Sequence, residues 1–238
     1  MTPEDELFSE EATRWAKANR TRLANELTAT ERYPGEQTPV SLFMAGSPGA
    51  GKTEAAQALA AELGDFLIVD PDALRKYIPG YNGTNSWLVQ DAVSRIVERI
   101  LDKAFQQSQS FLLDGTLSNH AIAYRNVQRC LSKGRLVQII FVYQEPIQAW
   151  AFVQAREATE GRKIPPLKFV DQFFASRDVV AQLKREFGRD VKIDVILKNI
   201  DGSNRMYHAN VSELESVVPL QYDRDQVIKI VNNGGGRE

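Results

Sequence analysis

Residues 46–53 read Gly46-Ser47-Pro48-Gly49-Ala50-Gly51-Lys52-Thr53, and this octapeptide matches the pattern GxxxxGK(S/T) of phosphate-binding loops. An apolar run, 40–45, precedes it, and a helix-forming run, 53–63, follows it. The glycines let the backbone aim N–H groups at phosphate oxygens, and the N-terminus of the helix adds a favourable dipole. Lys52 would contact the β- and γ-phosphates and Thr53 would bind Mg²⁺. A turn that binds nothing needs neither side chain, so we interpret all eight residues as a nucleoside-triphosphate site.

Short apolar runs alternate with longer helical patterns along the rest of the chain. This order is typical of a mostly parallel sheet flanked by helices. The expected strands are 40–45, 66–70, 110–114, 136–143 and 191–197. The expected helices are 52–63, 84–107, 118–133, 146–159 and 167–187. Together with the loop, the pattern predicts an α/β protein with a P-loop kinase fold.

The two ends of the chain differ from this central pattern. An amphipathic helix over 4–27 indicates an N-terminal helical extension, 1–35, which either packs on the core or contacts a partner. The kinase domain is expected over 36–230, and it ends in a β-hairpin with a turn at Asp201-Gly202. Residues 231–238, which include three consecutive glycines, are expected to be a disordered tail.

Composition limits the classes of partner and the location. Lys and Arg total 29 and Asp and Glu total 31, so no strong field of one sign favours nucleic acid or an anionic membrane. Cys130 is the single cysteine, which excludes an internal disulfide and predicts a buried thiol. No apolar run is long enough to span a bilayer, and the N-terminus is acidic where a signal peptide is basic. These features predict a soluble, cytoplasmic protein.

Acidic residues close the second and third expected strands, as Asp70-Pro71-Asp72 and Asp114-Gly115-Thr116. Ligands of open α/β sheets collect at the carboxyl ends of the strands, so these acids should lie beside the loop. One carboxylate could take a proton from a hydroxyl acceptor, and another could hold Mg²⁺ through water. The pattern does not choose between Asp70 and Asp72 as the base. Helix capping is the structural alternative, by Asp72 for one segment and by Thr116 or Ser118 for the other.

The loop alone leaves the acceptor open, because GTPases, motor ATPases and small-molecule kinases share it. GTPases need an Asn-Lys-x-Asp type element after a later strand, and here 136–143 continues as Gln144-Glu145-Pro146. We therefore expect a kinase and not a guanine-specific switch protein.

Five features in order resemble the zeta toxins, P-loop kinases of bacterial toxin–antitoxin systems. They are the loop at 46–53, the segment 69–75 with its Asp-Pro-Asp, the Asp-Gly-Thr at 114–116, the arginine in 154–157, and the run 161–166. The resemblance covers roughly 40–185. It implies phosphorylation of the sugar 3′-hydroxyl of UDP-N-acetylglucosamine, with ATP or GTP as donor, Mg²⁺ as cofactor, and restraint by an antitoxin protein.

The resemblance also implies roles for individual residues. Asp72 would be the general base, and Arg156 and Arg162 would approach the transferred phosphate, where planar guanidinium donors suit the spread charge. Asp114 and Thr116 would orient the acceptor or the metal. The structural alternative for the arginines is pairing with Glu157 and Glu160 on a solvated helix face.

Two departures from the family pattern concern the acceptor. Asp114 stands where a glutamate is usual, and Ser118 stands where an arginine is frequent. The aromatic residues of the segment 76–83 either line the acceptor pocket or fill the core beneath a loop. A nucleoside, nucleotide, dinucleotide or antibiotic hydroxyl is thus an alternative acceptor. A nucleotide-dependent regulatory protein is the alternative of another class.

Overall fold

A computed structural model describes residues 2–64, 66–199, 204–219 and 221–233. Within these residues the chain forms a six-stranded sheet with the order β2-β3-β1-β4-β5-β6. The first five strands pair in parallel, and β6 pairs with β5 antiparallel. The strands are β1 Val40–Ala45, β2 Leu67–Val69, β3 Phe111–Leu113, β4 Leu136–Tyr143, β5 Val191–Lys198 and β6 Asn204–His208. The predicted α/β class, parallel sheet and C-terminal hairpin strands are confirmed, while the expected turn at 201–202 lies outside the described residues.

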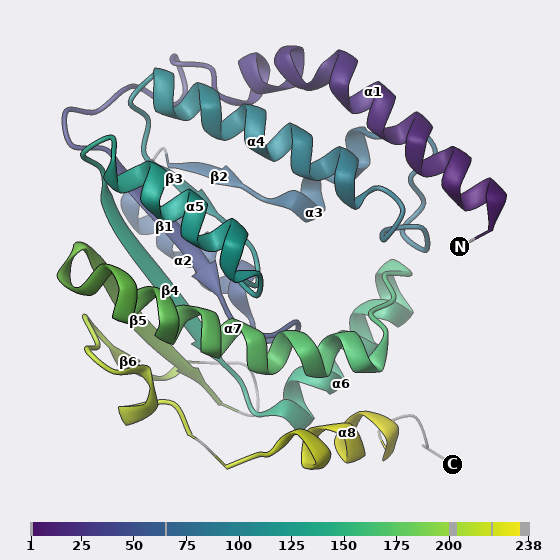
Figure 1. The fold of residues 1–238 in the computed structure, drawn as a ribbon, viewed down its shortest axis with the longest axis vertical. Coiled ribbons are helices and arrows are strands. Elements are labelled where there is room, and N and C mark those ends of the chain that lie inside the picture. The colour runs from purple at the N-terminus through teal and green to yellow at the C-terminus, as the bar shows by residue number, and fades with distance from the viewer. Residues whose placement is uncertain (1, 65, 200–203, 220, 234–238) are drawn as a thin grey trace.

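Helices connect the strands and flank the sheet (Figure 1). They are α1 Pro3–Leu27, α2 Lys52–Leu63, α3 Pro71–Leu74, α4 Gln90–Gln106, α5 His120–Leu131, α6 Pro146–Glu160, α7 Pro166–Phe187 and α8 Arg224–Asn233. Short 3₁₀ helices cover Arg75–Tyr77, Gly188–Asp190 and Leu214–Ser216. The helix expected over 84–107 begins six residues later, because residues 84–89 form turns. α8 was not expected from the pattern, and a helix at the position of α3 was considered only as the capping alternative for Asp72.

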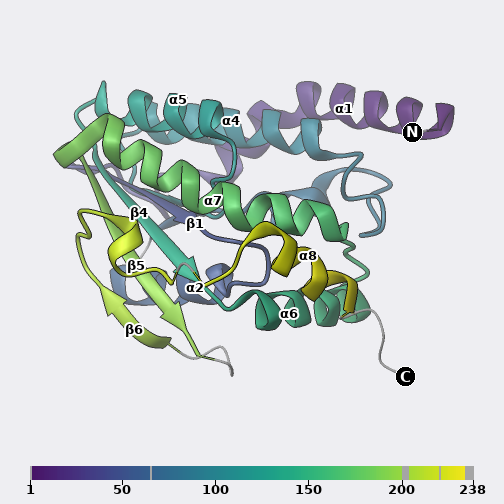
Figure 2. The ribbon, with the colours of Figure 1, turned by 60° about the horizontal axis from the view of Figure 1, so that its bottom comes forward.

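The central strand β1 is buried on both faces, which explains why all its residues except Ser41 are apolar. Phe43 and Ala45 face the larger core, and Leu42 and Met44 face the smaller one. α4, α5 and α7 cover the first face, whereas α2 covers the second (Figure 2). This layering leaves the carboxyl ends of the parallel strands free for a site.

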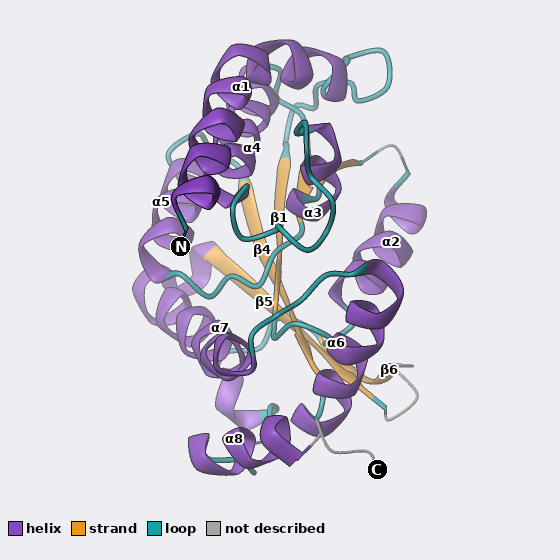
Figure 3. Cartoon of the chain, turned by 90° about the vertical axis from the view of Figure 1, so that its right-hand side faces the viewer, coloured by secondary structure: helices purple, strands orange, loops and turns teal. Residues whose placement is uncertain are grey.

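α1 runs beside α4 on the outside of the sheet layer (Figure 3). Its small or apolar residues Ala12, Ala16, Leu23 and Ala24 are buried. Gln109 Nε2 donates to the carbonyl oxygen of Thr28, 2.9 Å away, and so ties the end of this helix to the strand layer. The small residues at this contact allow the two helices to approach closely.

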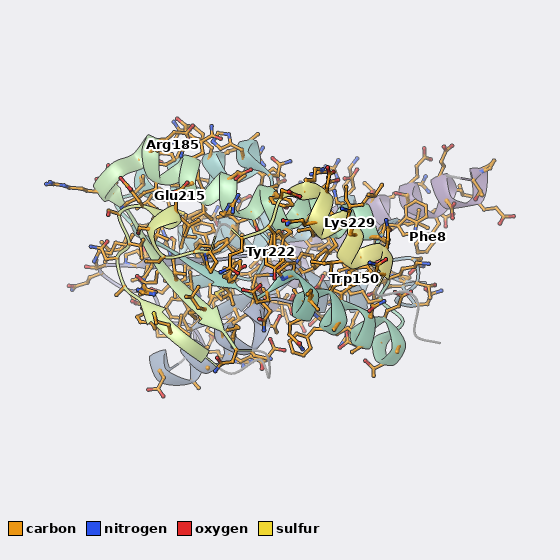
Figure 4. All side chains as sticks on the ribbon, turned by 90° about the horizontal axis from the view of Figure 1, so that it is seen from below. Phe8, Trp150, Arg185, Glu215, Tyr222 and Lys229 are labelled. Carbon is orange, nitrogen blue, oxygen red and sulfur yellow. The ribbon has the colours of Figure 1, made fainter. Side chains whose placement is uncertain are left out.

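α8 packs against α6 and α7 at the other end of the molecule. In Figure 4, α8, labelled at Lys229, lies next to α6, labelled at Trp150. Val231 is 3% exposed, so the tail expected from residue 231 is wrong for its first three residues, which complete α8. The amphipathic pattern of this short helix accounts for the difference. The rest of that expected tail lies outside the described residues.

Two smaller expectations concern burial and membranes. Cys130 is fully buried, as predicted. No helix in the described part of the chain combines the length and apolar character needed to cross a membrane.

Candidate functional site

A cleft of about 370 Å³ lies at the carboxyl ends of β1, β2 and β3. The parallel pairing of these strands puts the segments that follow them at one edge of the sheet. Backbone hydrogen bonds fix this arrangement: Asp114 N donates to Val69 O at 2.9 Å, and Gly46 N donates to Thr116 O at 3.2 Å. Nine residues whose side chains were singled out in the sequence line the cleft: Lys52, Thr53, Asp70, Asp72, Asp114, Thr116, Ser118, Arg156 and Arg162.

The loop between β1 and α2 has the backbone that its glycines predict. Gly46 has φ +134° and Gly49 has φ +72°, both in the region that side chains disfavour. A Cβ atom at Gly49 would also collide with the carbonyl oxygen of Ala149 in α6. Glycine is therefore required at this position by conformation and by the close approach of α6.

Lys52 begins α2 and folds back over its own loop. Its Nζ donates to the carbonyl oxygen of Ser47 at 2.6 Å. Although part of the residue remains accessible, desolvation lowers the pKa of Lys52 to about 8, against the raising effect of Asp114 and Asp72. A desolvated ammonium group at this loop is suited to bind an anion, which would stabilise the charged form of Lys52.

Thr53 and Asp114 form a direct link between the loop and the end of β3. The hydroxyl Oγ1 of Thr53 donates to Asp114 Oδ2 at 2.9 Å. Asp114 is 7% exposed, and this burial raises the pKa of its carboxyl group, while the hydrogen bond from Thr53 acts in the opposite direction. Asp114, although one methylene shorter than the glutamate usual in the family, thus reaches the hydroxyl group of Thr53 in the loop.

The two acids after β2 have different local contacts. Asp70 is the N-cap of α3, and its Oδ1 accepts from the backbone N of Asp72 at 2.8 Å. Pro71 follows at the first helical position, where its missing N–H costs nothing. The capping alternative considered for Asp72 is therefore wrong, because Asp70 is the cap. The carboxyl group of Asp72 is left to face the cleft.

Arginines contact both carboxylate oxygens of Asp72. Arg162 Nη1 donates to Oδ2, and Arg75 Nη1 lies 3.0 Å from Oδ1. Arg162 is placed there by Gly161, whose φ of +70° ends α6, and by the prolines that begin α7. The contact joins residues 90 positions apart. The suggested pairing of Arg162 with a neighbouring glutamate is therefore wrong.

Arg156 projects from the last turns of α6. Its Nη2 lies 3.2 Å from Glu160 Oε2, one turn along the helix, and the pair is about half exposed. This contact is the helix-face pairing considered as the alternative for Arg156, and the residue also lines the cleft. An exposed pair of this kind contributes little to stability, so the guanidinium can exchange partners.

Thr116 and Ser118 do not cap α5, because Asn119 does. Asn119 Oδ1 accepts from Ile122 N at 3.1 Å. The hydroxyl groups of Thr116 and Ser118 are 2.8 Å apart and both face the cleft. They offer a polar surface next to the first residue of the loop.

Arg75 belongs to the site although the sequence reasoning gave it no role. It is 8% exposed, and among the described residues nothing accepts from its Nε. Its Nη2 donates to Gln90 Oε1 at 3.4 Å, so it connects Asp72 to the start of α4. The spacing of three residues from Asp72 was the available signal, because it brings both side chains to one helical face.

The cleft continues from Asp72 between α4 and α5. The aromatic residues of the segment 76–83 are not part of its lining, since Tyr77 is 40% exposed and Tyr81 packs on the core.

The residues present fit a magnesium nucleotide. Thr53 offers a hydroxyl ligand, and the Asp114 carboxylate lies behind it. Among the described residues, no three carboxylate, imidazole or thiol groups gather at one point. A metal at Thr53 would thus take most of its ligands from phosphate and water, as Mg²⁺ commonly does.

Comparisons with known proteins agree with this geometry. The family model for the zeta toxin matches residues 24–212. In fold, the chain is similar to a protein of the PezAT chromosomal toxin–antitoxin system of Streptococcus pneumoniae, with 17% identity, 99% of this chain and 95% of that chain covered, and a TM-score of 0.66. Among curated proteins, none matches the sequence.

Two other solved structures share the fold. AvrRxo1-ORF1:-ORF2 with ATP has 16% identity, covers 93% of this chain and 76% of that chain, and gives a TM-score of 0.58. A putative kinase from Chloroflexus aurantiacus has 16% identity, covers 84% and 97%, and gives 0.50. The family match and the loop support a kinase-like function that uses ATP. Because the family model covers most of its length, the chain belongs to the zeta toxin family.

Proposed function

We propose that the protein transfers the γ-phosphoryl group of ATP, or of GTP, to a sugar hydroxyl of UDP-N-acetylglucosamine. The observation that carries this proposal is that Asp72 and Lys52 line one cleft, with Arg156 and Arg162 beside them. A donor site and a basic carboxylate in one cavity are what in-line transfer to a hydroxyl requires.

Asp72 acts as the general base. Its carboxylate accepts the proton of the acceptor hydroxyl while the hydroxyl oxygen forms a bond to the γ-phosphorus. The bond from that phosphorus to the bridging oxygen breaks, and the nucleoside diphosphate leaves with the electron pair. The contact from Arg75 to Oδ1 orients the carboxylate, so that Oδ2 serves the acceptor once Arg162 has moved.

Arg162, Arg156 and Lys52 stabilise the charge of the transferring group. Arg162 would exchange the carboxylate of Asp72 for the γ-phosphate, and Arg156 would exchange Glu160. Lys52 would release the carbonyl of Ser47 and contact the β- and γ-phosphates. Fixed guanidinium and ammonium groups aimed at developing charge typically contribute two to three orders of magnitude in rate, roughly.

Thr53 and Asp114 hold the metal side of the donor site. When bound, Mg²⁺ neutralises charge on the β- and γ-phosphates. The Thr53 hydroxyl would be its ligand, and Asp114 would orient that hydroxyl through the 2.9 Å hydrogen bond. Thr116 would contact the acceptor from the neighbouring segment.

An antitoxin protein is the partner that goes with this function, and the cytoplasm is the location. The PezAT relative is part of a toxin–antitoxin system, which supports the proposal. The exposed side of α1, opposite its contact with α4, is our candidate contact surface. Co-purification with the wild type and with Arg14→Glu/Lys17→Glu, which changes two exposed residues of α1, tests it, and equal capture of the same protein would contradict the assignment.

An acceptor panel tests the proposed reaction. Purified protein is incubated with ATP and Mg²⁺ and with UDP-N-acetylglucosamine, nucleosides, nucleotides, a dinucleotide or an aminoglycoside, and products are identified by mass spectrometry. We expect one added phosphate on UDP-N-acetylglucosamine. Transfer only to a nucleoside or a dinucleotide would show that this compound, and not UDP-N-acetylglucosamine, is the acceptor. ATP binding without any transfer would favour a regulatory protein.

A further inference from the structure

We propose that Arg125 is a specificity-determining residue that binds a phosphate group of the acceptor, between α4 and α5, at the opposite end of the cleft from Lys52. The inference rests on the proposed function and adds to it the position of the acceptor's own phosphate. It predicts that hydroxyl compounds carrying a phosphate or diphosphate are preferred over the corresponding compounds without one.

The cleft is longer than the reacting groups require. Gln90, at the start of α4, contacts Arg75 and therefore marks the level of Asp72. Glu98 lines the same cleft eight residues later, which is about 12 Å along the helix at 1.5 Å per residue. An acceptor with its hydroxyl at Asp72 and its body along α4 is thus longer than one sugar ring.

Most of the wall between Gln90 and Glu98 is apolar, with Ser94 and Asn126 as its uncharged polar residues. Val93, Val97 and Leu101 line it from α4, and Ile122 and Ala123 line it from α5. They provide contact area for a ring or a sugar but no counter-charge for a phosphate.

The basic residues of the lining fall into two groups. Lys52, Arg156 and Arg162 surround the donor loop, and Arg75 is buried against Asp72. Arg125, on α5, is the remaining basic residue among the described lining residues. A phosphate of the acceptor, far from the loop, therefore has Arg125 as its cationic partner.

Arg125 is available for such an exchange. Its Nη2 lies 3.2 Å from Glu98 Oε1, and the two side chains are 63% and 54% exposed. Ion pairs this exposed contribute little to stability. The planar guanidinium can bind two phosphate oxygens in a bidentate manner. A phosphate can therefore displace the solvent-exposed carboxylate of Glu98 from Arg125. Glu98 holds the arginine over the cleft until the acceptor is bound.

The next turn of the same helices supplies a matched control. Arg129 contacts Asp102 as an ion pair, four residues beyond Arg125 and Glu98 respectively. Neither Arg129 nor Asp102 lines the cleft. Replacing Arg129 removes the same charge from the same helix without touching the site.

Calorimetry separates this inference from the proposed reaction. The donor loop is first saturated with Mg²⁺ and a non-hydrolysable ATP analogue, and UDP is then titrated into the wild type, Arg125→Ala, Arg129→Ala and Glu98→Gln. We expect Arg125→Ala to weaken UDP binding about tenfold or more, as loss of a charged hydrogen-bond partner does. Arg129→Ala should change it less than about twofold, and Glu98→Gln should leave it equal or tighter.

Several outcomes would overturn the inference: no UDP binding by the wild type, equal affinity in Arg125→Ala, or an equal loss in Arg129→Ala. The titration measures UDP binding and does not depend on phosphoryl transfer. A failure of the proposed reaction is therefore detected separately, by the acceptor panel. Thermal melts of the variants identify any that fail to fold. For such a case, Arg125→Gln provides the second variant, and it should lose UDP binding in the same way.

Discussion

Arg162 donates a hydrogen bond to Oδ2 of Asp72, and so connects the loop after α6 to the residue that follows β2. Arg75 contacts the other oxygen of the same carboxylate at 3.0 Å. In the nucleotide-free protein the proposed base is thus held between two guanidinium groups. Binding of the donor offers Arg162 a more highly charged partner, so arrival of ATP would free the oxygen that the acceptor needs.

The first prediction concerns Arg162. Replacing it with alanine should lower the single-turnover rate of transfer by about 10²- to 10³-fold, the usual loss for one fixed donor to developing charge. ATP affinity should change little, because Lys52 and the loop remain. Arg224→Ala removes an exposed charge that pairs with Asp171 outside the cleft and should keep the wild-type rate. A loss below tenfold in Arg162→Ala would contradict the assigned role.

The second prediction concerns pH. The pKa of Lys52 is about 8 in the nucleotide-free protein, so the residue is charged below pH 8 and mostly neutral above it. Bound phosphates favour the charged form, so binding above pH 8 must take up a proton. ATP affinity should therefore fall about tenfold between pH 7 and pH 9, because one proton is linked to binding. Calorimetry in buffers of different ionisation enthalpy measures this uptake.

Lys52→Arg is the control for the pH experiment, because arginine stays protonated throughout this range. Its ATP affinity, whatever its value at pH 7, should not fall at pH 9. A wild-type affinity that does not change with pH would mean that Lys52 is not the titrating contact.

The third prediction concerns magnesium. Asp114→Asn should weaken Mg²⁺ binding to the enzyme–ATP complex about 10- to 100-fold, because the residue orients the Thr53 ligand. Electron paramagnetic resonance of Mn²⁺ bound with ATP gives the affinity without any turnover. Thr53→Ser keeps the hydroxyl and should stay near the wild type, while Thr53→Ala should resemble Asp114→Asn. Unchanged Mn²⁺ affinity in Asp114→Asn would contradict a role of Asp114 in metal binding and would leave only a role in binding the acceptor.

The fourth prediction concerns α1. Leu23 is fully buried in the core cluster that includes the contact with α4, so Leu23→Ala should lower the free energy of unfolding by about 2 to 5 kcal/mol. Leu7, on the same helix, is 56% exposed, and Leu7→Ala should cost less than about 0.5 kcal/mol. Urea denaturation measures both. Equal values would show that α1 is not part of the cooperative fold.

Much of the donor side could be predicted from the sequence, because its chemistry is local. The octapeptide at 46–53 contains its own conformational and charge requirements. The apolar run before it and the helix-forming run after it predicted β1 and α2 within a residue. The rule that parallel strands end at one edge brought Asp72 and Asp114 to the loop, where the structure has both in the lining.

Contacts between distant residues could not be predicted in this way. The sequence pattern suggested an ion pair between Arg162 and a neighbouring glutamate. In the structure the turn at Gly161 directs Arg162 to Asp72, 90 residues earlier. The choice between Asp70 and Asp72 depended on which carboxylate caps α3, and a Pro at the first helical position favours the residue before it. The cap is thus a local contact, whereas the contact of Arg162 with Asp72 depends on the strand order, which is a property of tertiary packing.

Transfer by Asp72→Asn is the measurement that tests the central claim most directly. The rate of phosphoryl transfer from ATP to UDP-N-acetylglucosamine is compared with that of the wild type and of Asp70→Asn, whose amide oxygen can still accept the cap hydrogen bond. We predict a loss of about 10²- to 10⁴-fold in Asp72→Asn, the range for removal of a general base, with ATP binding retained and Asp70→Asn near the wild type. Equal activity in Asp72→Asn and the wild type would contradict the account.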